Sequence, residues 1–182
     1  MTTYEAPPLT PDEARAVLQQ LGDLTSKIVL VGGQALAFWA NHYADRIRPT
    51  GPVNSKDIDF CGFTDAVEIA AERLGGTFQI PEPFSNTPNT GLVAFKDRRG
   101  QERRMDFLGD VYGLDSKEVI EWAIEVEVPV VGGDIAFKVM HPFHCLNPGS
   151  RTLGACPATR RPLRSIKLEL RSYASANISA TG

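Results

Sequence analysis

The sequence is poor in cysteine and has no long apolar run. Its 182 residues include only three cysteines, Cys61, Cys145 and Cys156. This odd, scattered set does not make a disulfide framework and favours a reducing cytoplasm. No apolar run approaches the roughly 20 residues that span a bilayer. The N-terminal residues lack the basic-then-apolar layout of a signal peptide. We therefore expect a cytoplasmic protein that does not associate with membranes.

Several motifs that would define a chemistry are also missing. The pattern G-x-x-x-x-G-K-[ST] is absent, which argues against a P-loop NTPase. No Ser-His-Asp or Cys-His arrangement has a recognisable context, so nucleophilic hydrolysis is unsupported. His141, His144 and Cys145 are zinc-type ligands, but no fourth ligand is visible and the spacing matches no usual zinc site. Ordinary packing is the alternative for these residues.

The charges are distributed unevenly along the chain. Residues 147–182 carry six Arg or Lys against one acid, a net charge of +5, whereas residues 1–146 carry a net charge of −8. We predict a folded domain over residues 1–146 and a basic, weakly structured tail over residues 147–182, with a turn or two of helix at most over residues 165–173. Two interpretations of this tail stay open. It is either a frameshifted remnant of a helical region or an electrostatic arm for RNA.

Residue patterns predict alternating helices and strands in residues 1–146. Helices are expected from Thr10–Pro11 to Gly22, after Gly33, and from a Thr64 cap to Gly75–Gly76. Short helices are expected after a Ser116 cap and from Pro142. Strands are expected at 28–31, 57–60 and 77–80, with hairpins formed by 92–96 with 102–108 and by 125–131 with 135–139. The predicted fold class is α/β (α+β), with a mixed β-sheet flanked by helices.

The strongest chemical signal is a set of three acids on two predicted strands. Asp57 and Asp59 alternate with the apolar residues Ile58 and Phe60, so both carboxylates lie on one face of a strand, roughly 7 Å apart. Two such carboxylates converge on Mg²⁺ in many phosphate sites, although a solvated strand face is the ordinary reading of a bare D-x-D. Asp106 lies between apolar neighbours on a second strand, where an unpaired acid is costly.

A diglycine follows the first predicted strand. Gly32 and Gly33 allow the backbone to approach a phosphate closely, and the free N–H groups that open the next helix at Gln34 favour an anion. A strand that ends in two glycines is most often only a turn. Its combination with the three acids predicts a site for a nucleotide and a metal ion.

The order VGGQAL, SKDIDF and RMDFL resembles the nucleotidyltransferase fold of the DNA polymerase β superfamily. It is most similar to the small bacterial AbiEii-type group, which includes type IV toxin–antitoxin toxins. The resemblance covers about residues 25–146. The gap between Gly33 and Asp57 is longer than in compact members of the superfamily. The family continues past a segment like residues 141–146 into a helical C-terminal half, and this chain does not.

The resemblance implies roles for individual residues. Gly32 and Gly33 would touch the triphosphate. Asp57 and Asp59 would bind Mg²⁺ or Mn²⁺. Asp106 would share a metal ion and help to activate the acceptor hydroxyl group.

Two further residues are expected to contact the nucleotide. They are Ser55, just before the acid pair, and Lys138, on the last predicted strand. Both are weaker assignments than the glycines and the acids.

The expected function is metal-dependent transfer of an NMP from an NTP, such as ATP, to a hydroxyl group on an RNA (tRNA-like) or protein acceptor. The expected partners are the NTP, that acceptor and, if the protein is a toxin, an antitoxin. No recognition of DNA sequence is expected. One alternative is a catalytically weak or inactive nucleotide-binding protein of the same fold. Another is a plain RNA-binding module, which predicts steep salt dependence from the tail.

Overall fold

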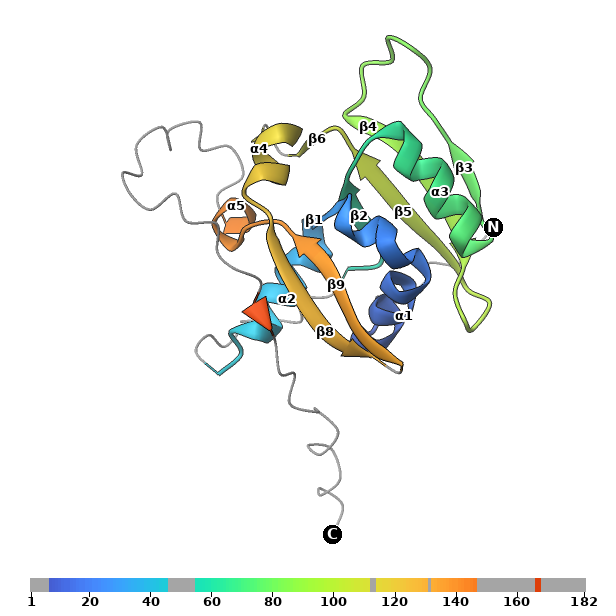
Figure 1. Cartoon of the computed structure of the whole chain (residues 1–182). Coiled ribbons are helices and arrows are strands. Elements are labelled where there is room, and N and C mark those ends of the chain that lie inside the picture. The colour runs from blue at the N-terminus through green and yellow to red at the C-terminus, as the bar shows by residue number, and fades with distance from the viewer. Residues whose placement is uncertain (1–6, 46–54, 112–113, 131, 147–165, 168–182) are drawn as a thin grey trace, which may run out of the picture.

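A mixed β-sheet organises the chain, with helices packed against it (Figure 1). The computed structural model describes residues 7–45, 55–111, 114–130, 132–146 and 166–167. The main sheet has eight strands in the order β10-β8-β9-β1-β2-β5-β4-β3, and β6 and β7 form a separate two-stranded sheet. The protein therefore belongs to the mixed α+β class, as predicted.

Most elements lie where the sequence pattern predicts them. The helices are α1 (Pro11–Leu21), α2 (Gly32–His42), α3 (Thr64–Leu74), α4 (Ser116–Glu121) and α5 (Pro142–Leu146), with a short 3₁₀ helix, η1 (Gly22–Ser26). The strands are β1 (Val29–Val31), β2 (Ile58–Cys61), β3 (Thr77–Gln79), β4 (Asn89–Lys96), β5 (Glu102–Leu108), β6 (Asp110–Val111), β7 (Leu114–Asp115), β8 (Ile124–Val130), β9 (Gly133–Val139) and β10 (Ile166–Lys167). Among the described residues, no helix is long and apolar enough to cross a membrane.

Local capping explains where several helices begin and end. The Thr10 hydroxyl accepts the Glu13 N–H while the Glu13 carboxylate accepts the Thr10 N–H, so the predicted capping box of α1 is confirmed. Gly75 ends α3 in the left-handed conformation, as expected. Two predicted caps are wrong by one residue, because Phe63 precedes α3 and the Asp115 side chain caps α4.

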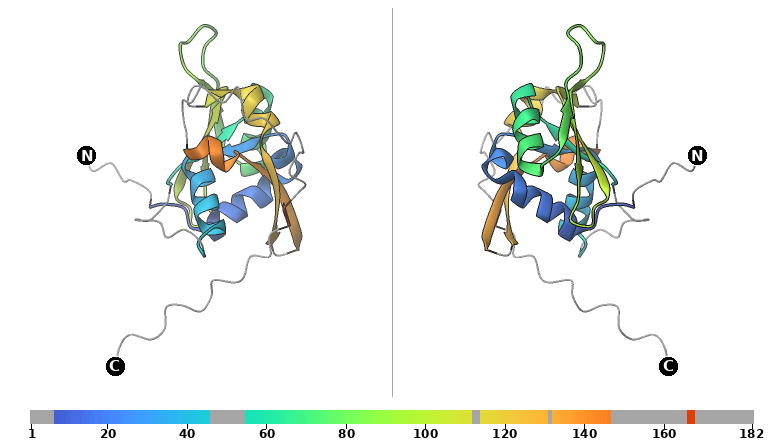
Figure 2. Two further views of the ribbon diagram at one scale, coloured as in Figure 1. Left: turned by 90° about the vertical axis from the view of Figure 1, so that its left-hand side faces the viewer. Right: turned by 90° about the vertical axis from the view of Figure 1, so that its right-hand side faces the viewer.

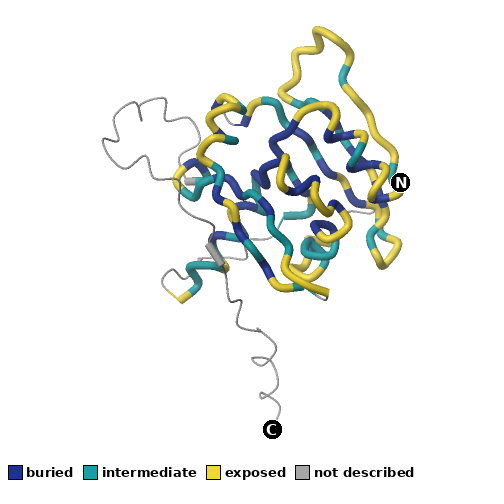
Figure 3. The backbone as a smooth tube through the Cα atoms, in the orientation of Figure 1, coloured by how far each residue is buried: buried dark blue, intermediate teal, exposed yellow. Residues whose placement is uncertain are grey.

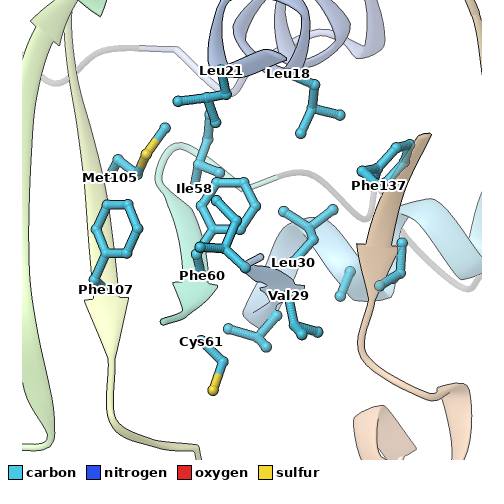
Figure 4. Close-up of a cluster of buried hydrophobic side chains, with 14 of the residues drawn as sticks. Leu18, Leu21, Val29, Leu30, Ile58, Phe60, Cys61, Met105, Phe107 and Phe137 are labelled. Carbon is cyan, nitrogen blue, oxygen red and sulfur yellow. The ribbon is translucent and has the colours of Figure 1, made fainter. Parts of the chain in front are cut away.

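The face of the sheet that carries Phe60 and Phe107 packs against helices, and further buried residues such as Val29 and Cys61 point to the other face (Figure 4). Phe60 of β2 and Phe107 of β5 are fully buried there, and their rings stack with centroids 6.0 Å apart. Leu18 and Leu21 of α1 and the side chains of α3 pack on this face. Phe38 of α2 meets Phe137 of β9 edge to face. Burial of this face fixes which way every second side chain on β2 and β5 points.

The opposite face of the sheet is only partly covered. Helix α4 contacts β2, and the charges of Asp110 in β6 and Asp115 in β7 act on Cys61 at the C-terminal end of β2. Along β4 and β5, side chains on the core face are buried, whereas those on the other face are exposed or half-buried. Figure 2 shows the β8–β9 and β4–β5 hairpins toward opposite ends of the sheet. On this opposite face, called the open face below, Arg104 is exposed and Asp59 and Asp106 are half-buried, whereas Val31, the register partner of Asp59, is fully buried.

The prediction for residues 147–182 is largely outside the described residues. Ile166 and Lys167 form β10, which pairs in parallel with Val126 and Glu127 of β8. The sequence predicted a turn or two of helix at most over residues 165–173, and the two residues of that range that the structure describes form a strand instead. The frameshift and RNA-arm interpretations fall on residues that the structure does not describe.

Candidate active site

Two of the three predicted acids are direct neighbours on adjacent strands. β2 and β5 run in parallel, and Asp59 is the register partner of Asp106. Their sequence neighbours on the two strands point into the core, with exposed fractions of 3% for Ile58 and 0% for Met105. Because strand side chains alternate, both carboxylates lie on the open face of the sheet. The sequence predicted each acid, and the fold brings Asp59 and Asp106 together.

Asp57 lies just before β2 and is exposed. The sequence predicted that it would be part of the strand, so the strand begins one residue later than expected. Its charge still acts on the other two acids, because it raises the pKa of both Asp59 and Asp106. The three carboxylates therefore form one electrostatically coupled group.

The raised pKa values of Asp59 and Asp106 show that burial and neighbouring carboxylates outweigh the nearby positive charge. Burial raises the pKa of Asp59 to about 6, and the charges of Asp106 and Asp57 add to this effect. Burial also raises the pKa of Asp106, where the Arg104 guanidinium acts in the opposite direction and Asp57 raises it further. A cation bound among these groups would relieve their mutual repulsion and favour the ionised forms.

Gly32 and Gly33 open α2 directly after β1, and they pack against Asp59 and Ser55 respectively. Gly32 has φ +62, and a Cβ atom built on it would lie 2.2 Å from Asp59 Oδ2. A Cβ atom on Gly33 would lie 2.8 Å from Ser55 Cβ. The two glycines are the first residues of α2 rather than a turn before it. The sequence therefore needs glycine here because Asp59 and Ser55 occupy the space of a side chain.

Substituting Gly32 tests this close approach. Gly32→Ala is expected to destabilise the protein by about 2 kcal/mol or more, because the methyl group adds a clash with Asp59 to the left-handed backbone strain. Gly100→Ala is the matched control, since Gly100 has φ +75 and open space around it, and it should cost only about 1 kcal/mol. Urea unfolding measures both. Equal losses in the two variants would show that Asp59 does not need the space at Gly32.

Ser55 makes hydrogen bonds that stabilise the segment just before Asp57 and Asp59. Its hydroxyl donates to the carbonyl of Asp57 at 3.0 Å. Its own carbonyl accepts two hydrogen bonds, from the Gln34 side chain at 3.0 Å and from the Leu9 N–H at 3.1 Å. Ser55 thus joins α2, the N-terminal segment and the acid pair. The sequence prediction did not include Gln34, although its position directly after the diglycine was a usable signal.

Lys138 lies on the same face of the sheet as the acids, two strands away from Asp59. It lies on β9 opposite Val29 of β1, in a row of residues that continues through Cys61 of β2. Strands are about 4.8 Å apart, so two strand spacings, or roughly 10 Å, separate the strands of Lys138 and Asp59. The sequence placed Lys138 on the correct strand but could not give the order of the strands.

Arg104 is the basic residue beside the acids, and the sequence prediction missed it. It is two residues before Asp106 on β5, so its exposed side chain lies on the same open face. Its charge lowers the pKa of Asp106 against the effect of burial. The signal was present in the sequence as the alternation Arg104-Met105-Asp106. A cation at this position can meet the phosphates of a nucleotide.

The acids fit Mg²⁺ or Mn²⁺ in chemistry but do not form a complete cage. Carboxylate oxygens are the ligands these ions prefer, and Mg²⁺ is usually held by one or two carboxylates together with water and substrate phosphates. Within the described ranges, no three His, Cys, Asp or Glu side chains are close enough together to hold a metal ion. This result applies also to His141, His144 and Cys145. Asp59 and Asp106 can supply two ligands, and phosphate oxygens would complete the shell.

Comparisons with protein-family models, with curated proteins and with solved structures found no match for this chain.

Proposed function

We propose that this protein is a metal-dependent nucleotidyltransferase of the nucleotidyltransferase fold, which moves an NMP from an NTP to a hydroxyl group of an RNA or protein acceptor. The observation that carries the proposal is the pairing of Asp59 with Asp106 on adjacent parallel strands, beside a glycine bend that opens α2. Coupled carboxylates on an open sheet face suit a nucleotide triphosphate held through a divalent cation.

The reaction would be an in-line displacement at the α-phosphorus. The acceptor hydroxyl oxygen forms a bond to this phosphorus, and the bond to the oxygen bridging the α- and β-phosphates breaks, so pyrophosphate leaves. Mg²⁺, when bound, neutralises charge on the phosphate oxygens. Asp59 and Asp106 would hold that ion, with Asp57 as a third carboxylate beside them. Asp106, whose pKa is raised by burial and by Asp57, is suited to take the hydroxyl proton.

The backbone would position the triphosphate. The N–H groups at Gly32 and Gly33 open α2, whose N-terminus has no side-chain cap and no acid in its first turn. These groups and the helix dipole favour an anion. Arg104 on the open face supplies a full positive charge near the same acids. Catalysis would then depend on positioning and charge neutralisation, with little covalent work by the protein.

A second candidate is a nucleotide-binding protein of the same fold without turnover. The observation that favours it is the absence, within the described residues, of three side chains already gathered as metal ligands. An exposed Asp57 that does not turn toward the ion would leave the site able to hold Mg-ATP but poor at catalysis. Both candidates predict that the protein binds Mg-ATP, and only the first predicts that it transfers an NMP to an acceptor.

A labelling assay separates the two candidates. Each α-³²P-labelled NTP is incubated with the protein, MgCl₂ or MnCl₂, and a tRNA pool or a protein pool as acceptor. Transfer of label is expected with the wild type, and Asp106→Asn should lower it at least about 100-fold. Asp45→Asn, which changes an exposed acid at the end of α2, is the matched control and should transfer normally.

The outcomes are distinct. Undiminished labelling by Asp106→Asn would refute the assignment of the site. Calorimetric binding of Mg-ATP without labelling of any acceptor would favour the second candidate.

A further inference from the structure

The loop between β3 and β4 presents an aromatic side chain that nothing in the described structure covers. Phe84 is fully exposed, with a relative accessibility of 104% (Figure 3 shows the loop as exposed). It is also the one non-glycine residue with positive φ among those the structure describes, at φ 69. An exposed phenylalanine makes no apolar contact that would stabilise the fold, and positive φ is a strained conformation for a residue with a side chain.

The local sequence holds Phe84 in this conformation. The Ser85 N–H donates to the Glu82 carbonyl at 3.0 Å, which closes a turn with Pro83 and Phe84 at its centre. Proline at the second position and positive φ at the third are features of a type II turn, where glycine or asparagine normally takes the third place. The chain thus presents an aromatic ring where a small residue would fold more easily. This pattern indicates a recognition role.

A cavity whose volume matches a phenylalanine ring lies elsewhere on the same molecule. Residues of α1, α2, β1 and the β8–β9 hairpin enclose a cavity of about 120 Å³ with mainly apolar walls, which include Leu18, Leu30, Phe38, Val128 and Phe137. An apolar cavity of roughly 150 Å³ can take a benzene molecule. A phenylalanine ring therefore has about the right volume to occupy this cavity.

The one charged residue of the loop can meet an arginine at the rim of the cavity. The loop from Gln79 to Asn89 carries Glu82 as its one charged residue, so it suits neither a phosphate backbone nor an anionic membrane. The cavity lining includes Arg15 and His42 but no acid. The Arg15 side chain is 35% exposed and pairs with the exposed Asp12 at 2.6 Å. Glu82 would therefore reach Arg15 at the rim in competition with Asp12 when Phe84 enters the cavity.

The positions of the two features require two molecules. The loop projects beyond α3 at one end of the protein, whereas α1 and α2 lie in the other half (Figures 1 and 2). We propose that Phe84 of one copy docks in the cavity between α1, α2 and the β8–β9 hairpin of a second copy. This contact joins different surfaces of the two copies, so it either closes as a reciprocal dimer or extends as a chain. The proposal does not depend on the proposed enzymatic function.

Sedimentation of the full chain over a concentration series tests the proposal. The wild type should associate, and Phe84→Ser and the cavity-filling variant Ala14→Phe should each weaken association at least tenfold. Phe63→Ser is the matched control, because Phe63 is also an exposed aromatic, at 59%, but lies outside the loop. It should associate like the wild type. Circular dichroism of each variant checks that it is folded.

Mixing the two defective variants is the decisive step. The Phe84→Ser variant keeps an empty cavity, and the Ala14→Phe variant keeps Phe84. An equimolar mixture should therefore form 1:1 dimers that grow no further. If Ala14→Phe does not fold, the experiment uses the charge-swap variants Glu82→Lys and Arg15→Glu instead. Each of these variants should associate weakly alone, and association should be restored when the two are mixed.

Three results would overturn the proposal. The first is a wild type that stays monomeric up to about 1 mM, the concentration range of very weak association. The second is association by Phe84→Ser equal to that of the wild type. The third is mixtures of the two variants that remain monomeric.

Discussion

Asp59→Asn is expected to stabilise the cation-free protein at pH 7.5 while it abolishes nucleotide transfer. Burial, Asp106 and Asp57 raise the pKa of Asp59 from 3.8 to about 6. At pH 7.5 the folded protein must therefore hold an ionised carboxylate in an unfavourable place. An amide of the same shape removes this repulsion, and it also removes a ligand that transfer needs.

The sign of the pH dependence follows from the raised pKa. A carboxyl group that binds its proton more tightly when folded favours folding at low pH, and this contribution is lost as the pH rises through about 6. The full shift is discounted because the group is partly exposed, which leaves a gain of roughly 1–2 kcal/mol for Asp59→Asn at pH 7.5. The gain should disappear below pH 4, where Asp59 is largely protonated.

Urea unfolding with EDTA at both pH values measures this difference, and the labelling assay measures transfer. Transfer should fall at least about 100-fold. Asp45→Asn should change neither quantity. If Asp59→Asn is less stable than the wild type at pH 7.5, Asp59 has a structural role and is not held in place against repulsion.

Arg103→Met is expected to cause the largest loss of stability, about 3–5 kcal/mol, because it leaves a buried carboxylate without its partner. The side chains of Arg103 and Asp97 are 1% and 4% exposed, and Arg103 Nε donates to Asp97 Oδ2 at 2.9 Å. Arg103 also donates to the Pro7 carbonyl. The pair joins the turn end of the β4–β5 hairpin to the segment that leads into α1.

The pH dependence of this pair has the opposite sign to that of Asp59. Burial raises the pKa of Asp97, but the backbone N–H of Gln101, the Arg103 side chain and the N–H of Arg99 outweigh this effect and hold the pKa below its usual value. The stabilisation is therefore complete above the unfolded-state pKa and is lost as the pH falls through the folded-state pKa.

Two variants control for the loss at Arg103. Arg99→Met breaks the pair with Glu13, in which the Arg99 side chain is 63% exposed, and should cost under about 1 kcal/mol. The double variant Arg103→Met with Asp97→Asn should recover part of the loss, because an amide oxygen still accepts the N–H groups of Arg99 and Gln101. A loss at Arg103 no larger than at Arg99 would show that the buried pair contributes little.

The sequence predicted the parts of the site that depend on local pattern. Apolar neighbours around Asp59 and Asp106 indicated which way each side chain points, and Gly32 and Gly33 indicated a close approach of the backbone. The structure gives the same directions and shows what the glycines approach, namely Asp59 and Ser55. These residues could be predicted from the sequence because strand alternation and the conformational freedom of glycine are local properties.

The parts that the sequence did not predict depend on long-range pairing. The parallel register of β2 with β5 and the place of β9 beyond β1 are set by packing of distant segments, so the distance of Lys138 from the acids was not readable. Arg104 was overlooked because its role depends on that register. The Thr64 and Ser116 caps differ by one residue from the observed helix starts, where neighbouring residues compete for the cap.

Diffraction from crystals grown with Mn²⁺ and a non-hydrolysable NTP analogue tests the central claim most directly, because the anomalous signal of manganese locates the ion without assumptions about activity. An ion bonded to the carboxylates of both Asp59 and Asp106, with triphosphate oxygens in its shell and the nucleotide against Gly32 and Gly33, is the predicted result. Manganese and nucleotide bound elsewhere, with Asp59 and Asp106 left without a cation, would contradict it.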